Sequence, residues 1–126
     1  MPMTHLALSA LQHTWLIDVD GTVLQHNGHK TGQDRLLPNV QEFWATIPAE
    51  DVIILLSART LDEMPRTLTF FEQAGLRYTH AFFGLPPGER IIINDAKPSG
   101  LKTAIAVNIV RDEGLDRLSV VVDPTL

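Results

Sequence analysis

The chain of 126 residues contains no cysteine. This absence excludes disulfides, thiolate metal ligands and cysteine nucleophiles. Basic residues (10) are fewer than acidic ones (15), and a formal net charge of -5 argues against a nucleic-acid-binding surface, which is normally basic. No segment approaches the roughly 18 apolar residues of a membrane span, and residues 1–14 lack the basic start and the cleavage site of a signal peptide. We therefore expect neither nucleic acid nor membrane as a partner, and a cytoplasmic location by default.

The composition is that of an ordinary globular protein, with 44% hydrophobic and 20% charged residues. The length suffices for one domain with one core. We find no internal repeat, low-complexity tract or linker along the chain. A single domain over residues 1–126 is the resulting prediction.

Apolar runs alternate with segments of helical spacing, which predicts strands alternating with helices. Residues 25–37 are polar and glycine-rich, as in a loop or flap. Residues 103–110 are rich in β-branched side chains and favour a strand, although a helix also fits their spacing. The other expected strands are residues 14–19, 51–56, 78–83, 90–93 and 119–122, and the expected helices are residues 38–47 and 60–74.

This alternation predicts an α/β fold with a parallel sheet and right-handed crossovers. Ligands of such sheets bind beyond the carboxyl ends of the strands. Three polar clusters follow predicted strands, at residues 18–22, 57–60 and 94–97. We expect them to converge at one rim of the sheet and to form the functional site there.

The first cluster carries the most chemical information. Asp18 and Asp20 point the same way on an extended chain, about 6.5–7 Å apart, and such carboxylates repel each other unless a cation or a proton lies between them. Asp18 could attack phosphorus, while Asp20 could protonate the leaving oxygen and later take a proton from water. Gly21 permits a tight turn, and Thr22 offers a hydroxyl and an N–H to phosphate. The alternatives are a surface turn or a calcium loop, but the next residues supply no further oxygen ligands.

The second cluster is predicted to bind the phosphate. Ser57 follows a hydrophobic strand directly, so its hydroxyl could reach a phosphoryl oxygen. Ala58 and Arg59 complete the predicted phosphate-binding segment, while Thr60 could instead cap the next helix.

The third cluster supplies a second metal carboxylate and a cation. Asp95 together with Asp18 could hold Mg²⁺, whose other positions would be filled by water, backbone oxygen and phosphate. Lys97 could neutralise the phosphoryl charge, as phosphoryl transfer requires. Lys102, Arg90 and Lys30 compete for that role.

Three of these segments together resemble the haloacid dehalogenase-like phosphohydrolases. Residues 18–22 (Asp-Val-Asp-Gly-Thr) resemble the nucleophile motif of that family, residues 55–57 its Ser/Thr motif and residues 91–95 its acidic metal motif. The resemblance implies a Rossmann-like sheet of order 3-2-1-4-5 with helices on both faces. It implies Asp18 as nucleophile, Asp20 as general acid/base with its carbonyl on the metal, Ser57 at the phosphate and Asp95 as a Mg²⁺ ligand.

Two features depart from the family pattern. The family's lysine normally precedes the acidic motif, whereas residues 78–90 contain no lysine, so Lys97 would have to replace it. The connections are also too short for a cap domain. Capless members either act on large substrates or use a neighbouring subunit as a lid, so a homo-oligomer is one expectation, and sugar phosphates and nucleotides are candidate substrates.

Three functions are therefore compared. The first is a Mg²⁺-dependent phosphomonoesterase that acts through an aspartyl-phosphate. The second is a signalling receiver domain, which is disfavoured because the second predicted strand ends in Ser57 where a phosphoacceptor aspartate would be needed. The third is a catalytically silent relative that binds a phosphorylated ligand or a partner.

Overall fold

The computed structural model describes residues 3–126, and its strands are all parallel to their partners. The helices are α1 and α2, and two short 3₁₀ turns, η1 and η2, lie in the connections. In chain order the elements are β1 (Thr4–Leu8), β2 (Thr14–Asp18), η1 (Gly28–Lys30), α1 (Val40–Thr46), β3 (Val52–Leu56), η2 (Leu61–Glu63), α2 (Met64–Gln73), β4 (His80–Phe82) and β5 (Leu118–Val122).

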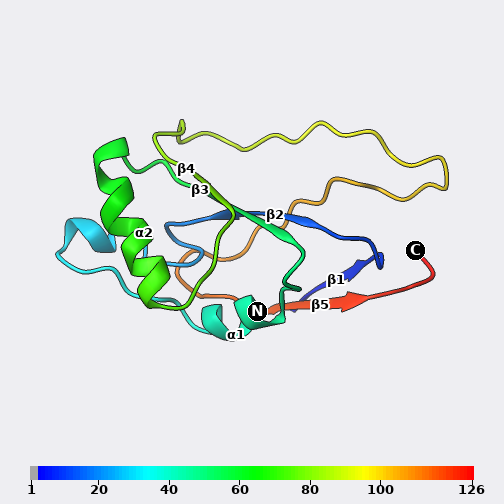
Figure 1. Ribbon diagram of the computed structural model, residues 1–126, viewed down its shortest axis with the longest axis horizontal. Helices are drawn as coiled ribbons and strands as arrows, with labels where there is room; N and C mark the ends of the chain where they lie inside the picture. Colours follow the sequence, from blue (N-terminus) through cyan, green and yellow to red (C-terminus); the bar gives the residue numbers. More distant parts are fainter. Residues whose placement is uncertain (1–2) are drawn as a thin grey trace.

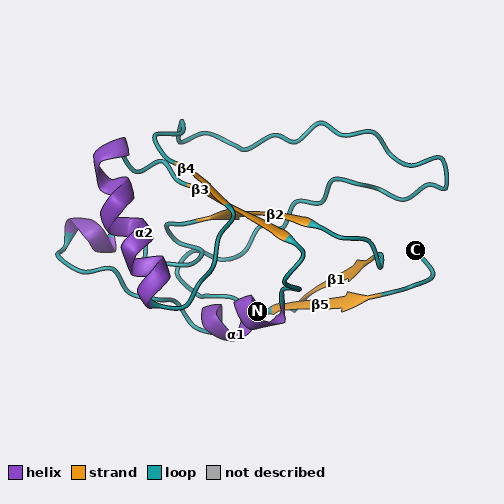
Figure 2. Cartoon of the chain, viewed as in Figure 1, coloured by secondary structure: helices purple, strands orange, loops and turns teal. Residues whose placement is uncertain are grey.

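The strands form two small sheets (Figure 2). Strands β2, β3 and β4 make one sheet with β3 in the centre, and β1 and β5 pair to make the other. The prediction of an α/β fold with parallel strands is confirmed. The first three predicted strands correspond to β2, β3 and β4, and they lie in the order β4-β3-β2. A continuous 3-2-1-4-5 sheet with helices on both faces is absent from the described residues, because the chain divides its strands between two sheets.

The core lies where α1 and α2 pack on the central strand. Ile53 and Leu55 on β3 are fully buried, whereas Ile54 between them is only half-buried. Phe71 of α2 is fully buried, and Trp44 of α1 contacts it edge-to-face with ring centroids 6.2 Å apart. Pro48 follows α1, as expected from the restriction that proline places on the residue before it. Strands β2 and β3 pair from Thr14 opposite Val52 to Asp18 opposite Leu56, and this pairing holds their carboxyl ends together.

Strand β1 was not predicted, and β5 was. β1 pairs with β5 from Thr4 opposite Leu118 to Leu8 opposite Val122. A pairing between segments at opposite ends of the chain has no local sequence signature, because it depends on where the rest of the fold places them. Within residues 3–126, no helix has the length and hydropathy needed to cross a membrane.

Residues 89–110, called the arm below, form a long excursion without helix or strand. Figure 1 shows the arm, in yellow and orange, running out beyond the end of β1 and returning as a second limb. Its tip turns with hydrogen bonds from Lys97 N to Leu101 O (2.9 Å) and from Gly100 N to Lys97 O (2.8 Å). The two limbs are joined by a hydrogen bond from Asn94 Nδ2 to Thr103 Oγ1 (2.7 Å).

The arm overturns two predictions. The expected strand at residues 90–93 is wrong, and residues 103–110 are neither strand nor helix. The run Ile91-Ile92-Ile93 has the β-branched composition of a strand, but a strand also needs a neighbour, and the run pairs with no strand among residues 3–126.

Candidate functional site

The candidate site is the rim at the carboxyl ends of β2 and β3. Asp18 is the last residue of β2, and Val19 N donates to Leu56 O of β3 (3.1 Å). The chain then folds tightly, since the N–H groups of Val23 and Leu24 both donate to Val19 O. Gly21 makes this turn possible with a φ of 85°, which costs other residues strain.

Asp18 is accessible from solvent. Its side chain is 43% exposed, and Arg90 Nη2 lies 3.7 Å from its Oδ1. Thr22 Oγ1 donates to its other oxygen (3.3 Å). Partial burial raises the pKa of Asp18 above its ordinary value, and Arg90 and Thr22 oppose this effect only in part. The carboxylate with the hydroxyl beside it is therefore the group at this rim that a substrate could reach.

Arg59 organises the interior of the rim. Its side chain is 1% exposed and lies between two carboxylates. Arg59 donates to Asp20 from Nε (3.0 Å) and Nη2 (2.7 Å), to Asp34 from Nη1 (3.0 Å) and Nη2 (2.7 Å), and to Thr67 Oγ1 from Nη1 (2.9 Å). Burial alone would lower the pKa of Arg59, but the hydrogen bonds to Asp34 and Asp20 outweigh it and raise that pKa.

All five N–H donors of the Arg59 guanidinium are occupied by this arrangement. Arg59, predicted to bind phosphate, has no donor left for a phosphate here and instead fixes Asp20 in position. Sequence reasoning missed Asp34, which lies in the loop expected as a flap and whose side chain is only 7% exposed. A buried arginine needs carboxylate partners, but nothing in the sequence identifies which aspartates or glutamates those partners are.

Ser57 and Ala58 also lie at the rim. Ser57 is 1% exposed, and its Oγ accepts a hydrogen bond from Arg59 N (3.0 Å). Its backbone N–H donates to Phe82 O of β4 (2.9 Å). Ala58 is exposed. The first two predicted clusters therefore meet, joined chiefly by the Arg59–Asp20 ion pair.

The third cluster does not join them. Asp95 and Lys97 lie on the arm, where Asp95 O accepts from Thr103 Oγ1 and Lys97 makes the tip turn. In the part of the chain that the structure describes, no group of three or more His, Asp or Glu side chains could hold a metal ion. The prediction that all three clusters converge is wrong for a single chain, and the carboxylates at this rim do not by themselves fit Mg²⁺.

Both ends of the arm are nevertheless anchored to the loop that carries Asp18. At the first end, Arg90 pairs with Asp18, and it is the only one of the four candidate cations with a contact to that carboxylate in residues 3–126. At the second end, Asp112 N donates to Gly21 O (2.9 Å), and Asp112 Oδ1 accepts from His26 N (2.7 Å). The arm thus starts and finishes at the candidate site while its tip lies elsewhere.

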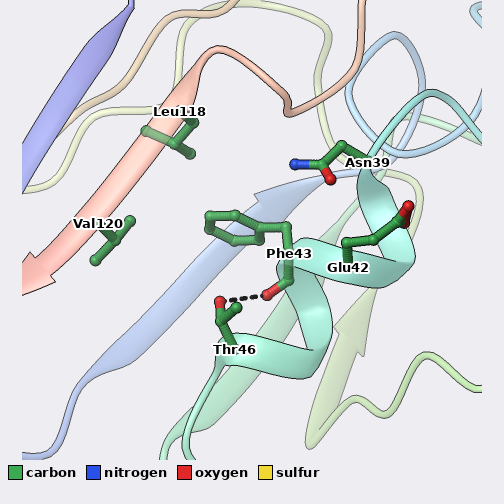
Figure 3. Close-up of a pocket in the computed structure, with 6 residues that line it drawn as sticks. All are labelled: Asn39, Glu42, Phe43, Thr46, Leu118 and Val120. Carbon is green, nitrogen blue, oxygen red and sulfur yellow. Dashed lines mark hydrogen bonds between the residues drawn. The ribbon is translucent and has the colours of Figure 1, made fainter.

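A shallow hollow of about 230 Å³ lies between α1 and β5 (Figure 3). Thr46 Oγ1 donates to Phe43 O within the helix (2.6 Å), and Asn39 Nδ2 donates to Leu115 O (3.4 Å). No lining residue belongs to the rim loops, so the hollow has no connection with the carboxylates described above. The lining residues are Asn39, Glu42, Phe43, Thr46, Leu118 and Val120.

Comparison of the chain with protein families, curated proteins and solved structures gave no significant match.

The raised pKa of Asp18 has a measurable consequence for stability. A carboxyl group whose folded-state pKa exceeds its unfolded value adds stability below the ordinary pKa of 3.8, and this contribution is lost as pH rises through the folded pKa. At neutral pH the ionised Asp18 carboxylate therefore lowers the free energy of unfolding. In metal-free buffer, Asp18→Asn is expected to raise the melting temperature by roughly 1–3 °C at pH 7, and the gain should shrink as pH falls toward 4. A lower melting temperature at pH 7 would contradict this.

Proposed function

We propose that this protein is a phosphomonoesterase of the haloacid dehalogenase-like type, with Asp18 as the nucleophile. The supporting observation is the position of Asp18: a solvent-accessible carboxylate at the carboxyl end of a parallel strand, with the Thr22 hydroxyl against it and Ser57 directly after the neighbouring strand. The strand order β4-β3-β2 supplies the 3-2-1 part of the sheet that such a protein would have.

In the proposed reaction, an oxygen of Asp18 attacks phosphorus and the bond from phosphorus to the ester oxygen breaks. The leaving oxygen takes a proton, for which Asp20 is the candidate donor. Water then attacks the aspartyl-phosphate, Asp20 takes its proton, and phosphate leaves as Asp18 is regenerated. Arg59 acts here as a positioning residue, because its contacts hold the Asp20 carboxylate beside this path.

Mg²⁺ belongs to this proposal as the group that would neutralise phosphoryl charge. Its proposed ligands are Asp18, the carbonyl of Asp20 and Asp95, with Lys97 as an additional cation. Of these proposed ligands, Asp18 and Asp20 lie at the rim, whereas Asp95 lies on the arm, so no step is assigned to the ion here. The proposed substrate is a small phosphorylated metabolite such as a sugar phosphate or a nucleotide.

A second candidate function is a silent relative that binds a phosphorylated ligand or a partner. The observation that favours it is the occupation of the Asp20 carboxylate by Arg59. If Asp20 stays bound in this way when ligand is present, no acid is available for the leaving group.

The experiment that decides between them is hydrolysis of p-nitrophenyl phosphate, with Mg²⁺ and with EDTA. Asp18→Asn is expected to lower kcat by about 10³-fold or more, because it removes the nucleophile. Asp116→Asn, at an exposed acidic residue, serves as the matched control and should keep wild-type activity. Turnover that survives in Asp18→Asn would refute the mechanism, and a wild-type protein that binds phosphate without turnover would favour the silent relative.

A further inference from the structure

Strand β2 has an unpaired edge that leads to the candidate site. Among the described residues β2 pairs only with β3, so no strand is hydrogen-bonded to its other edge. Leu16 in this strand is 43% exposed, and Asp18 ends it. An open parallel edge presents unpaired N–H and C=O groups to any extended segment that reaches it.

The arm carries an extended segment suited to such an edge. Ile91, Ile92 and Ile93 are 81%, 48% and 92% exposed, and every residue from 86 to 100 is exposed. Burying isoleucine side chains stabilises a folded protein, so three isoleucines left in water forgo that stabilisation. Contiguous exposed apolar residues of this kind mark an interaction surface.

The spacing between these isoleucines and the polar tip matches the length of β2. If residues 91–93 lie parallel to β2 with Ile93 opposite Leu16, Asp95 falls opposite Asp18. Neighbouring strands lie about 4.8 Å apart, so two such carboxylates are close enough to share a divalent ion. Lys97 would follow just beyond the rim.

The arm of the same chain is directed away from this position. Its ends are held at the rim by Arg90 and Asp112, and the limbs run from there out beyond β1 (Figure 1). Each chain therefore has an open edge that ends at Asp18 and an arm that presents Asp95 elsewhere. One copy lacks at its site what another copy carries on its arm, and this reciprocal fit identifies a second copy as the occupant.

We propose that two copies of this chain exchange arms, so that residues 91–95 of each copy add as a parallel strand to the β2 edge of the other, while Arg90 stays at the rim of its own copy. The same exchange in both directions gives a closed, two-fold symmetric dimer. It brings Asp95 and Lys97 of one copy to Asp18 of its partner, and these are residues to which the proposed function assigns metal binding and neutralisation of phosphoryl charge. The catalytic part of this inference depends on the proposed function, whereas the arm exchange does not.

The exchange is tested first without reference to activity. The chain has no cysteine, so Leu16→Cys in a tagged copy and Ile93→Cys in an untagged copy, which share a face in this register, can be mixed, unfolded in urea, refolded and treated with a short bis-maleimide. A covalent heterodimer is expected, and a mixture without it would overturn the proposal. Sedimentation should give a dimer for the wild type and a dissociation constant raised at least 100-fold in Ile91→Asp/Ile93→Asp.

The control for that variant is Leu11→Asp, which places the same charge on an exposed leucine in the turn after β1. It should leave the dimer intact. Because all these side chains are exposed in one chain, circular dichroism should report folded protein for each variant. A monomeric wild type, or a dimer that is indifferent to Ile91→Asp/Ile93→Asp, would overturn the exchange.

Complementation tests the catalytic part. Asp18→Asn and Asp95→Asn are each expected to be inactive, but their mixture, refolded together from urea, should recover about a quarter of wild-type activity, since half of the dimers are mixed and each of these has one intact site. A dimer whose mixed variants stay inactive would overturn delivery of Asp95 between copies, and so would full activity of Asp95→Asn alone. An inactive wild type that still gives the covalent heterodimer would refute the proposed function and leave the exchange standing.

Discussion

Arg59→Met is expected to lower the free energy of unfolding by about 3–5 kcal/mol, because it leaves two carboxylates at the rim without their shared cation. The Arg59 side chain is 1% exposed, and those of Asp20 and Asp34 are 19% and 7% exposed. Methionine fills much of the volume but supplies none of the five hydrogen bonds. Urea unfolding followed by circular dichroism measures the loss.

Arg66→Met is the matched control. Arg66 pairs with Glu63 on the surface of α2, and its side chain is 59% exposed. Exposed pairs of this kind contribute about 0–1 kcal/mol, so the control should unfold close to the wild-type urea concentration. Equal losses in Arg59→Met and Arg66→Met would contradict a buried network.

A triple variant separates the ion pairs from packing. Asp20→Asn/Asp34→Asn/Arg59→Met removes the two carboxylates together with the guanidinium. Since the cost of Arg59→Met comes largely from buried charge left without a partner, the triple variant should be more stable than Arg59→Met alone. If the three substitutions acted independently, their losses would add and the triple variant would be less stable than Arg59→Met. That result would assign the effect of Arg59→Met to packing.

The parts of this fold that sequence alone could predict are those with local causes. The apolar runs at β2 and β3, the prolines around α1 and the amphipathic spacing of α2 all act within about ten residues. The meeting of Asp18 with Ser57 follows from two neighbouring parallel strands. Arg59 was assigned to phosphate because its position at the rim could be predicted, whereas its burial between Asp20 and Asp34 could not.

The failures share one physical cause. The strand expected at residues 90–93 and the unexpected strand β1 both depend on which distant segment is available as a neighbour. An isoleucine run has the same β propensity whether it is paired within its own chain, paired with another copy or unpaired. The predicted position of Asp95 depended on that strand, so the structure places Asp95 on the arm and not beside Asp18.

The second large effect is expected at Gly114, where the chain returns from the arm and packs against the start of α1. Gly114 has a φ of +81°, and a Cβ built on it would lie 2.2 Å from Pro38 O and 2.8 Å from Pro38 N. The next residue, Leu115, is 4% exposed and donates its N–H to Pro38 O (2.9 Å). The backbone at Pro38 has to move before any side chain can be accommodated at position 114.

Gly114→Ala is therefore expected to cost about 3 kcal/mol or more, as overpacking adds to the strain of a left-handed backbone. Gly75→Ala provides the comparison, because Gly75 has a φ of +75° but nothing within 4 Å of the added Cβ. That variant should lose only about 1 kcal/mol. Both substitutions reduce the entropy of the unfolded chain equally, so the difference between their urea midpoints reports the contact with Pro38. Equal midpoints would mean that residues 114–115 do not pack on Pro38, and the anchor that holds the second end of the arm near Gly21 would then have to be assigned to Asp112 alone.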